Sequence, residues 1–112
     1  MIRVTLTGEG NKLSLRLKGH AGYAEIGKDI ICASASILVY TTAQLIFEME
    51  AQGYLAKSPT VKLCEGDALV EAECKDVTAK AVAERIMHFA EAGYSLLQNT
   101  YPEYIKFVIN EA

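Results

Sequence analysis

Apolar and polar residues alternate in the N-terminal part of the chain, which is the pattern of strands with one buried face. Every second position is apolar over residues 2–7 and again over residues 13–18. The glycine-containing polar segment 8–12 between them is typical of a turn. The pattern therefore predicts an antiparallel hairpin, and it places His20 just past the second strand, where the chain leaves the sheet.

Two later segments have the character of helices instead. Asp29 can cap a helix over residues 30–52, because its carboxylate can accept hydrogen bonds from free backbone N–H groups, and Gly53 can end it. Apolar residues run nearly all round this helix, so we expect its own domain or a second subunit to bury it on most sides. Asp76 can cap a second helix over residues 77–97. The apolar stripe of this second helix consists of Val82, Ile86, Phe89, Ala90, Gly93 and Leu97.

Three further strands complete the predicted fold. Residues 61–65 and 68–75 are expected to pair around a tight Gly66-Asp67 turn, and residues 105–110 alternate as a last strand. The order strand, strand, helix, strand, strand, helix, strand predicts an α+β fold with two helices packed on a mainly antiparallel sheet. The whole chain of 112 residues is expected to be a single domain with its own core.

The composition is that of a soluble globular protein, with 51% apolar and 22% charged residues. A net charge of −3 gives no basic footprint for a nucleic-acid surface. The N-terminus lacks the pattern of a secretory signal, and polar residues interrupt the longest apolar stretch, 30–49, too often for a membrane span. We therefore expect a cytoplasmic protein with no direct nucleic-acid partner and no membrane partner.

Three cysteines at irregular spacing, Cys32, Cys64 and Cys74, predict reduced thiols rather than a disulfide framework or a zinc ribbon. Cys64 and Cys74 lie in strand patterns without a neighbouring histidine, so we expect both of them in the core. His88 has Glu84 one turn before it in the second helix, which favours an exposed pair over a catalytic base.

The segment 19–36 holds the most reactive residue types of the chain. It places His20 at the end of a strand, then a loop with Gly22 and Gly27, then Cys32 in the first turn of a helix. Free N–H groups at a helix N-terminus favour negative charge, and a nearby imidazolium adds to the effect. We therefore expect the pKa of Cys32 to fall below the usual value of ~8.5. The pair predicts a thiol nucleophile with its base, and the same N–H groups could hold an oxyanion.

The spacing alone leaves other interpretations open. Cysteine is among the most often buried residue types, so Cys32 in an apolar helix is also typical of a core thiol. Asp29 can cap the helix or orient His20 as a third catalytic member. Ser36, one turn beyond Cys32, can hydrogen-bond near the site or simply let helix and sheet approach closely. His20, Asp29 and Cys32 fall short of the usual zinc ligand set, so we expect no metal and no other cofactor.

The segments 19–21 (GHA) and 27–36 (GKDIICASAS) together resemble the signature of the ribosomal-processing cysteine protease family, Prp. The likeness extends over the whole chain in length and element order, but these segments are its specific part. The sequence departs from the family pattern at Ser34, where a smaller glycine or alanine is expected. This departure leaves the His20 and Cys32 pair untouched.

The resemblance implies a cytoplasmic cysteine endopeptidase that removes a short N-terminal extension from a large-subunit ribosomal protein. The nucleophile of the family maps onto Cys32 and its histidine onto His20, while Asp29 and Ser36 occupy positions that the family usually fills in the same way. Members of the family are homodimers with a mobile loop over the site, which here corresponds to residues 21–28. The apolar first helix is a candidate for the dimer surface.

Two other classes of function stay open. A non-catalytic ribosome-assembly factor would bind the same ribosomal protein without cutting it, and such a protein has no need of a His20 and Cys32 pair. A redox-sensing thiol protein needs an accessible Cys32 near a resolving cysteine.

Overall fold

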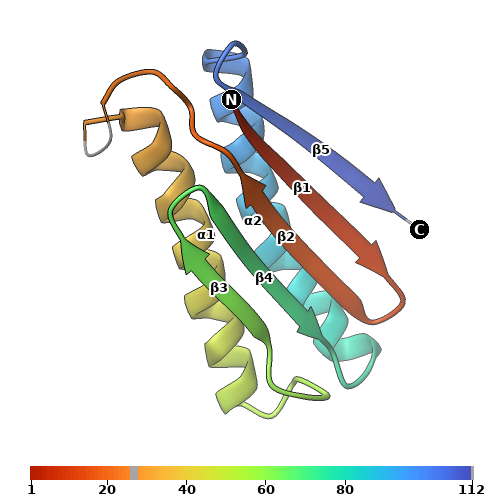
Figure 1. The fold of residues 1–112 in the computed structure, drawn as a ribbon. Coiled ribbons are helices and arrows are strands. Elements are labelled where there is room, and N and C mark those ends of the chain that lie inside the picture. Colours follow the sequence, from red (N-terminus) through yellow and green to blue (C-terminus); the bar gives the residue numbers. More distant parts are fainter. Residues whose placement is uncertain (26–27, 112) are drawn as a thin grey trace.

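A five-stranded sheet and two helices make up the computed structural model, which describes residues 1–25 and 28–111 (Figure 1). The elements follow one another in the order that the hydrophobic pattern predicts. The strands are β1 (Ile2–Glu9), β2 (Lys12–Lys18), β3 (Thr60–Cys64), β4 (Asp67–Glu73) and β5 (Ile105–Glu111), and the helices are α1 (Ile30–Ala51) and α2 (Val77–Thr100).

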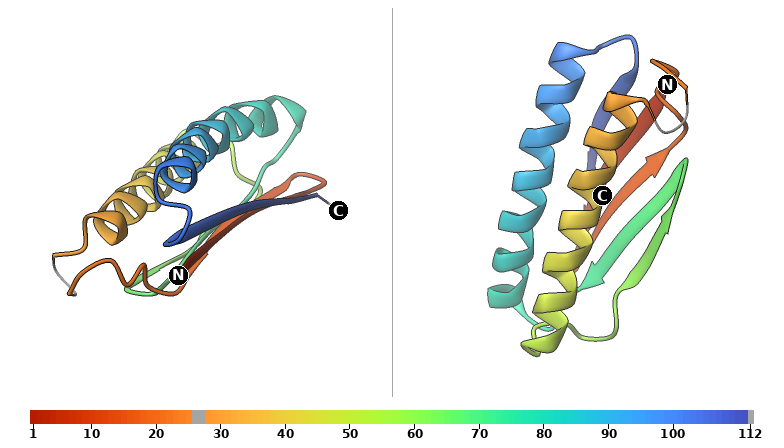
Figure 2. Two further views of the ribbon diagram at one scale, coloured as in Figure 1. Left: turned by 90° about the horizontal axis from the view of Figure 1, so that it is seen from above. Right: turned by 90° about the vertical axis from the view of Figure 1, so that its left-hand side faces the viewer.

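The sheet has the strand order β3-β4-β2-β1-β5. β1 and β5 run parallel, whereas the other neighbouring pairs are antiparallel. Both helices lie on the same face of the sheet, and in the described part of the chain no helix covers the opposite face (Figure 2). This confirms the predicted α+β fold, and it leaves one sheet face open to solvent.

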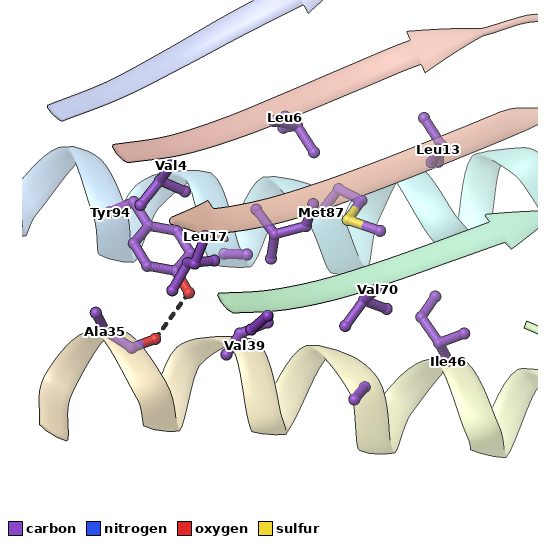
Figure 3. Close-up of a cluster of buried hydrophobic side chains, with 14 of the residues drawn as sticks. Val4, Leu6, Leu13, Leu17, Ala35, Val39, Ile46, Val70, Met87 and Tyr94 are labelled. Atoms are coloured by element: carbon purple, nitrogen blue, oxygen red, sulfur yellow. Dashed lines mark hydrogen bonds between the residues drawn. The ribbon is translucent and has the colours of Figure 1, made fainter. Parts of the chain in front are cut away.

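The core lies between the sheet and the two helices. Alternate side chains of β1, β2 and β4 point at the helices and are buried there. Tyr94 of α2 is fully buried, and its hydroxyl donates a 2.8 Å hydrogen bond to the carbonyl of Ala35 in α1 (Figure 3). A Cβ at Gly93 would lie 2.6 Å from Leu38 Cδ2, so the glycine lets the two helices pack at close range. The helical layer therefore holds α1 in a defined position over the sheet.

α2 differs from its prediction at its end and on its apolar face. It runs to Thr100, because Pro102 rather than an earlier residue stops it. Val82 and Phe89 are exposed, although the period placed them in the buried stripe. The buried residues of the helix are Ala79, Ala83, Met87, Ala90 and Tyr94. Ala90 belongs to the predicted stripe, and Ile86, Gly93 and Leu97 of that stripe are half-buried. Periodicity cannot say which of two apolar stripes faces the sheet, and the close contact between the helices selects the one with small residues.

Two smaller side-chain predictions are also corrected. His88 contacts Glu91, with 3.2 Å between Nδ1 and Oε2, rather than Glu84. Cys64 is exposed rather than in the core, because β3 is an edge strand and its pairing with Asp67 places Cys64 on the open face of the sheet. Cys74 is buried, as predicted.

The turn between β3 and β4 lies one residue earlier than expected. It consists of Glu65 and Gly66, since Asp67 is already paired with Cys64. Gly66 has a φ of 75°, a conformation that residues with a Cβ resist.

α1 is long and apolar enough to cross a membrane by length and composition, with a mean hydropathy of 1.8 over its most apolar window. Seven of its residues are nevertheless buried. The helix is therefore one layer of a folded domain, as is common for an apolar core helix.

Candidate active site

The end of β2, the start of α1 and the turn between β3 and β4 meet at one end of the molecule (Figure 1). They line a cavity of ≈ 330 Å³ that contains both His20 and Cys32. The structure thus brings together the two residues that the sequence predicts as a pair. Other residues at this cavity include Asp29, Ser36, Tyr40, Cys64, Glu65, Gly66 and Asp67.

His20 rests on the turn between β3 and β4. The Gly19 N–H donates a 2.9 Å hydrogen bond to the Gly66 carbonyl, which ties the end of β2 to this turn. A Cβ at Gly66 would lie 2.6 Å from His20 Nε2, so the imidazole packs directly against the glycine. Gly19 has a φ of 97°, and a Cβ there would collide with the Met1 carbonyl oxygen. Both glycines are therefore required for the position of His20.

Cys32 is half-buried in the first turn of α1. The Ala21 N–H donates a 3.4 Å hydrogen bond to its sulfur atom. Burial raises the pKa of the Cys32 thiol, and the negative charges of Asp29 and Glu65 add to this rise, whereas the Ala21 N–H opposes it. The predicted lowering of this pKa by the helix N-terminus is therefore wrong for this structure.

Asp29 explains why the helix N-terminus does not act on Cys32 as expected. Its Oδ1 accepts hydrogen bonds from the N–H groups of Ile31, at 2.9 Å, and Cys32, at 3.0 Å. Its Oδ2 accepts from the N–H groups of Tyr23, at 3.0 Å, and Ala24, at 3.3 Å. The N–H groups that were expected to stabilise a thiolate or an oxyanion are thus already bound by the Asp29 carboxylate.

Asp29 is a helix cap in this structure. Burial raises its pKa, but its four backbone hydrogen bonds together outweigh burial and hold the pKa below its usual value. These bonds occupy both carboxylate oxygens, and no hydrogen bond links Asp29 to His20 among the described residues. Two of the four bonds hold the loop between β2 and α1, so Asp29 fixes the loop and the helix together.

The remaining predicted site residues have different outcomes. Ser36 lines the cavity one turn after Cys32. Gly22 lies in the loop with a φ of 71°, a conformation that favours glycine. Gly27 lies outside the described residues. No hydrogen bond joins His20 to Cys32 in the described part of the chain, although both line the cavity.

A metal site has no support in the residues that the structure describes, because they contain no group of three His, Cys, Asp or Glu side chains that could hold an ion. Glu65 and Gly66 are among the cavity residues that sequence reasoning missed. Gly66 was recognised only as part of a turn, since nothing local relates that turn to a histidine on a distant strand.

We expect Asp29→Asn to destabilise the protein by about 1–3 kcal/mol, because the amide NH₂ would face two backbone N–H donors in a buried site. Urea unfolding at neutral pH measures this loss. Folding lowers the pKa of Asp29, so its ionised form stabilises the protein above the unfolded value of 3.8, and this stabilisation is lost as the pH falls through the folded pKa. The variant should lack this acid-dependent component.

The matched control is Asp76→Asn, in the cap of α2. Asp76 accepts a single side-chain hydrogen bond, 2.8 Å from the Ala79 N–H, and asparagine caps about as well as aspartate. Equal losses in the two variants would contradict the role given to Asp29.

A family model described as cysteine protease Prp matches residues 1–106. The chain belongs to the Prp family of cysteine proteases. The match covers every element that lines the cavity, and it confirms the resemblance that the His20 and Cys32 segments carry. No curated protein matches the chain.

Solved structures similar to this Prp-family chain have the same fold. The S. aureus ribosomal processing protease Prp with a covalently linked product peptide gives a TM-score of 0.75 at 23% identity, covering 98% of this chain and 100% of that chain. SMU.848 from Streptococcus mutans gives 0.69 at 24% identity, covering 100% and 96%. The S. aureus Prp with a substrate peptide gives 0.68 at 21% identity, covering 98% and 100%. At these identities the likeness establishes the fold.

Proposed function

We propose that this chain is a cysteine endopeptidase that removes the N-terminal extension of a large-subunit ribosomal protein, with Cys32 as the nucleophile and His20 as general base and acid. The cavity that presents the thiol and the imidazole together carries the proposal. Membership of the Prp family supports the protease activity. The S. aureus Prp, which shares the fold, has been solved with a substrate peptide. We place the enzyme in the cytoplasm, where its substrate is made and its thiols stay reduced.

In this mechanism His20 removes the proton of Cys32 as the sulfur attacks the scissile carbonyl carbon. The amine then leaves with a proton from His20, and water activated by His20 hydrolyses the thioester. Because burial raises the pKa of the Cys32 thiol, the attack needs the imidazole within hydrogen-bond reach of the sulfur to take its proton. We infer that a bound peptide closes the loop between β2 and α1 and brings the pair together.

Ala21 and Asp29 support this chemistry without reacting. The Ala21 N–H already points at the sulfur, so it is placed to stabilise the thiolate as it forms. Asp29 positions both Cys32 and the loop, because one of its oxygens binds the helix start and the other binds the loop backbone.

Mass spectrometry of the full-length ribosomal protein after incubation with the enzyme tests the proposal. We expect the mass to fall by that of the N-terminal extension. An unchanged mass, with binding retained, would favour the alternative of a non-catalytic ribosome-assembly factor.

The redox-sensing alternative needs a resolving cysteine near Cys32. Cys64 lines the same cavity, but its pairing with Asp67 places its side chain on the open face of the sheet, whereas α1 carries Cys32 over the opposite face. Cys74 is buried and lies beyond the far end of β4. Neither thiol is well placed to resolve a sulfenate on Cys32.

We also propose that the enzyme is a homodimer and that the outer face of the helical layer is its interface. Large apolar side chains are exposed along both helices at heptad-like spacing, which is typical of a helix face covered by another helix. They are Ile30, Ile37, Tyr40 and Phe47 on α1, and Val82, Phe89 and Leu96 on α2. So many exposed apolar side chains on one layer are unusual for a monomer.

Ile37→Asp and Phe89→Asp are each expected to convert the dimer to a monomer, because a charge would be buried without a partner at the interface. Both residues are 60% exposed in the single chain, so the monomer should still fold. Light scattering during gel filtration measures the mass. The control is Val77→Asp, which changes a more exposed apolar residue of α2 outside the stripe and should leave the dimer intact. Monomeric wild type would contradict the proposal.

A further inference from the structure

The open face of the sheet carries its charges in two separate groups. Register places Lys106, Arg3 and Lys18 side by side on β5, β1 and β2, at the end of the sheet where His20 follows. Arg16 and Lys62 lie one step further along, each aligned with Leu69 of β4. We call these five cations the basic end of the open face.

A single carboxylate forms ion pairs with three of these five cations. Asp67 contacts Lys62 at 2.7 Å, Arg16 at 3.4 Å and Lys18 at 3.5 Å. Arg3 and Lys106 form no ion pair among the described residues. The basic end therefore has a local excess of four positive charges on a chain whose net charge is −3.

At the other end of the same face the charges are balanced in ion pairs. Glu71 pairs with Lys12 at 3.3 Å, and Glu73 pairs with Lys57 at 3.7 Å. A chain of acidic net charge therefore has a local basic surface, because strand pairing brings together cations from four separate strands.

We propose that the basic end of the open sheet face binds the phosphodiester backbone of RNA, through Arg3, Lys18 and Lys106 in register across three strands. This revises the expectation, drawn from net charge, that the protein has no direct nucleic-acid partner. No helix covers this face in the described part of the chain, so a long ligand can lie across it (Figure 2). Neighbouring strands are about 4.8 Å apart, so the three cations form one continuous row that a phosphodiester backbone can follow.

The side chains around the basic end favour RNA over an acidic protein. A protein interface of useful affinity needs an apolar or aromatic centre that excludes water. The apolar residues aligned with these cations are Val108 and Leu69, and no aromatic side chain stands among them. An array of exposed cations without such a centre is suited to sequence-independent contact with a polyanion.

The position of the basic end links this surface to the cavity. Lys18 is two residues before His20, and Asp67 follows Gly66, on which the imidazole rests. An RNA bound here would lie beside the cavity, so a substrate protein in contact with that RNA would be presented to Cys32. The binding itself requires no proteolysis.

Fluorescence anisotropy with a labelled oligouridine tests the inference on the full chain. We expect binding that weakens with salt, with a slope of log K against log salt of about −0.7 for each phosphate neutralised. The double variant Arg3→Gln, Lys106→Gln should weaken binding about tenfold or more at low salt and reduce the slope by about 1.4. The double variant Lys12→Gln, Lys57→Gln removes the same charge from the other end and should bind like wild type.

Three outcomes would overturn the inference. They are no binding of the oligouridine at low salt, an equal loss in the two double variants, and equally tight binding of an oligoglutamate, which would indicate an acidic protein partner. Cys32→Ala should retain full RNA binding, and Arg3→Gln, Lys106→Gln should cleave a free peptide at the wild-type rate. The inference and the proposed protease function can therefore fail separately.

Discussion

Cys32→Ala is expected to lower kcat for cleavage of the ribosomal protein by at least about four orders of magnitude, because it removes the sulfur atom that is proposed to form the thioester. The half-buried position loses a single sulfur atom, so circular dichroism and thermal unfolding should match wild type. Mass spectrometry of a single-turnover reaction gives the remaining rate. His20→Ala should cause a similar loss, since the thiol would then lack its base.

Cys74→Ala is the control for this experiment. It removes a buried thiol outside the cavity and should retain cleavage, with a modest loss of stability. Cleavage by Cys32→Ala at the wild-type rate would end the proposed mechanism. A His20→Ala variant that cleaves normally, with Cys32→Ala inactive, would show that another group acts as the base.

Gly66→Ala is expected to lower kcat about a hundredfold, with a smaller effect on KM, because the added methyl group displaces the imidazole by about 1 Å. The Cβ would lie 2.6 Å from His20 Nε2 and 3.0 Å from Cε1, so the ring has to move. The left-handed φ of 75° adds a loss of stability of about 1–2 kcal/mol. Steady-state kinetics on a peptide substrate and urea unfolding measure the two effects.

Gly53→Ala separates the contact with His20 from the backbone strain. Gly53 has a φ of 80°, close to that of Gly66, but nothing lies within 4 Å of its added Cβ. It should show the same loss of stability with normal kcat. If the two variants lose activity equally, the contact between Gly66 and His20 has no part in catalysis.

The local pattern of the sequence was sufficient for the fold. Alternation predicted the strands, and Asp29 and Asp76 predicted the start of both helices, because capping and period depend on residues that are close in the chain. The joint presence of His20 and Cys32 at the ends of adjacent elements also predicted that they would share a site. These features need no knowledge of distant contacts.

Most of the predictions that the structure contradicts concern side chains whose surroundings come from segments distant in the chain. The stripe of α2 that faces the sheet, the exposure of Cys64 on an edge strand and the partner of His88 follow from neighbours that periodicity does not specify. The pKa of Cys32 rises because Asp29 takes the helix N–H groups and burial desolvates the thiol. The burial of the thiol cannot be read from spacing, whereas the binding of the helix N–H groups by Asp29 follows from its predicted role as the cap.

The sequence by itself therefore determined the order of elements, both helix caps and the pair of side chains, His20 and Cys32, that lines the cavity. The tertiary structure added the contact of Gly66 with His20, the four hydrogen bonds that occupy both carboxylate oxygens of Asp29, and the basic end of the open face. The physical reason is the distance along the chain over which each effect acts. Caps and alternation act within a few residues, whereas desolvation, packing and the summed field of charges depend on the strands and turns that folding brings together.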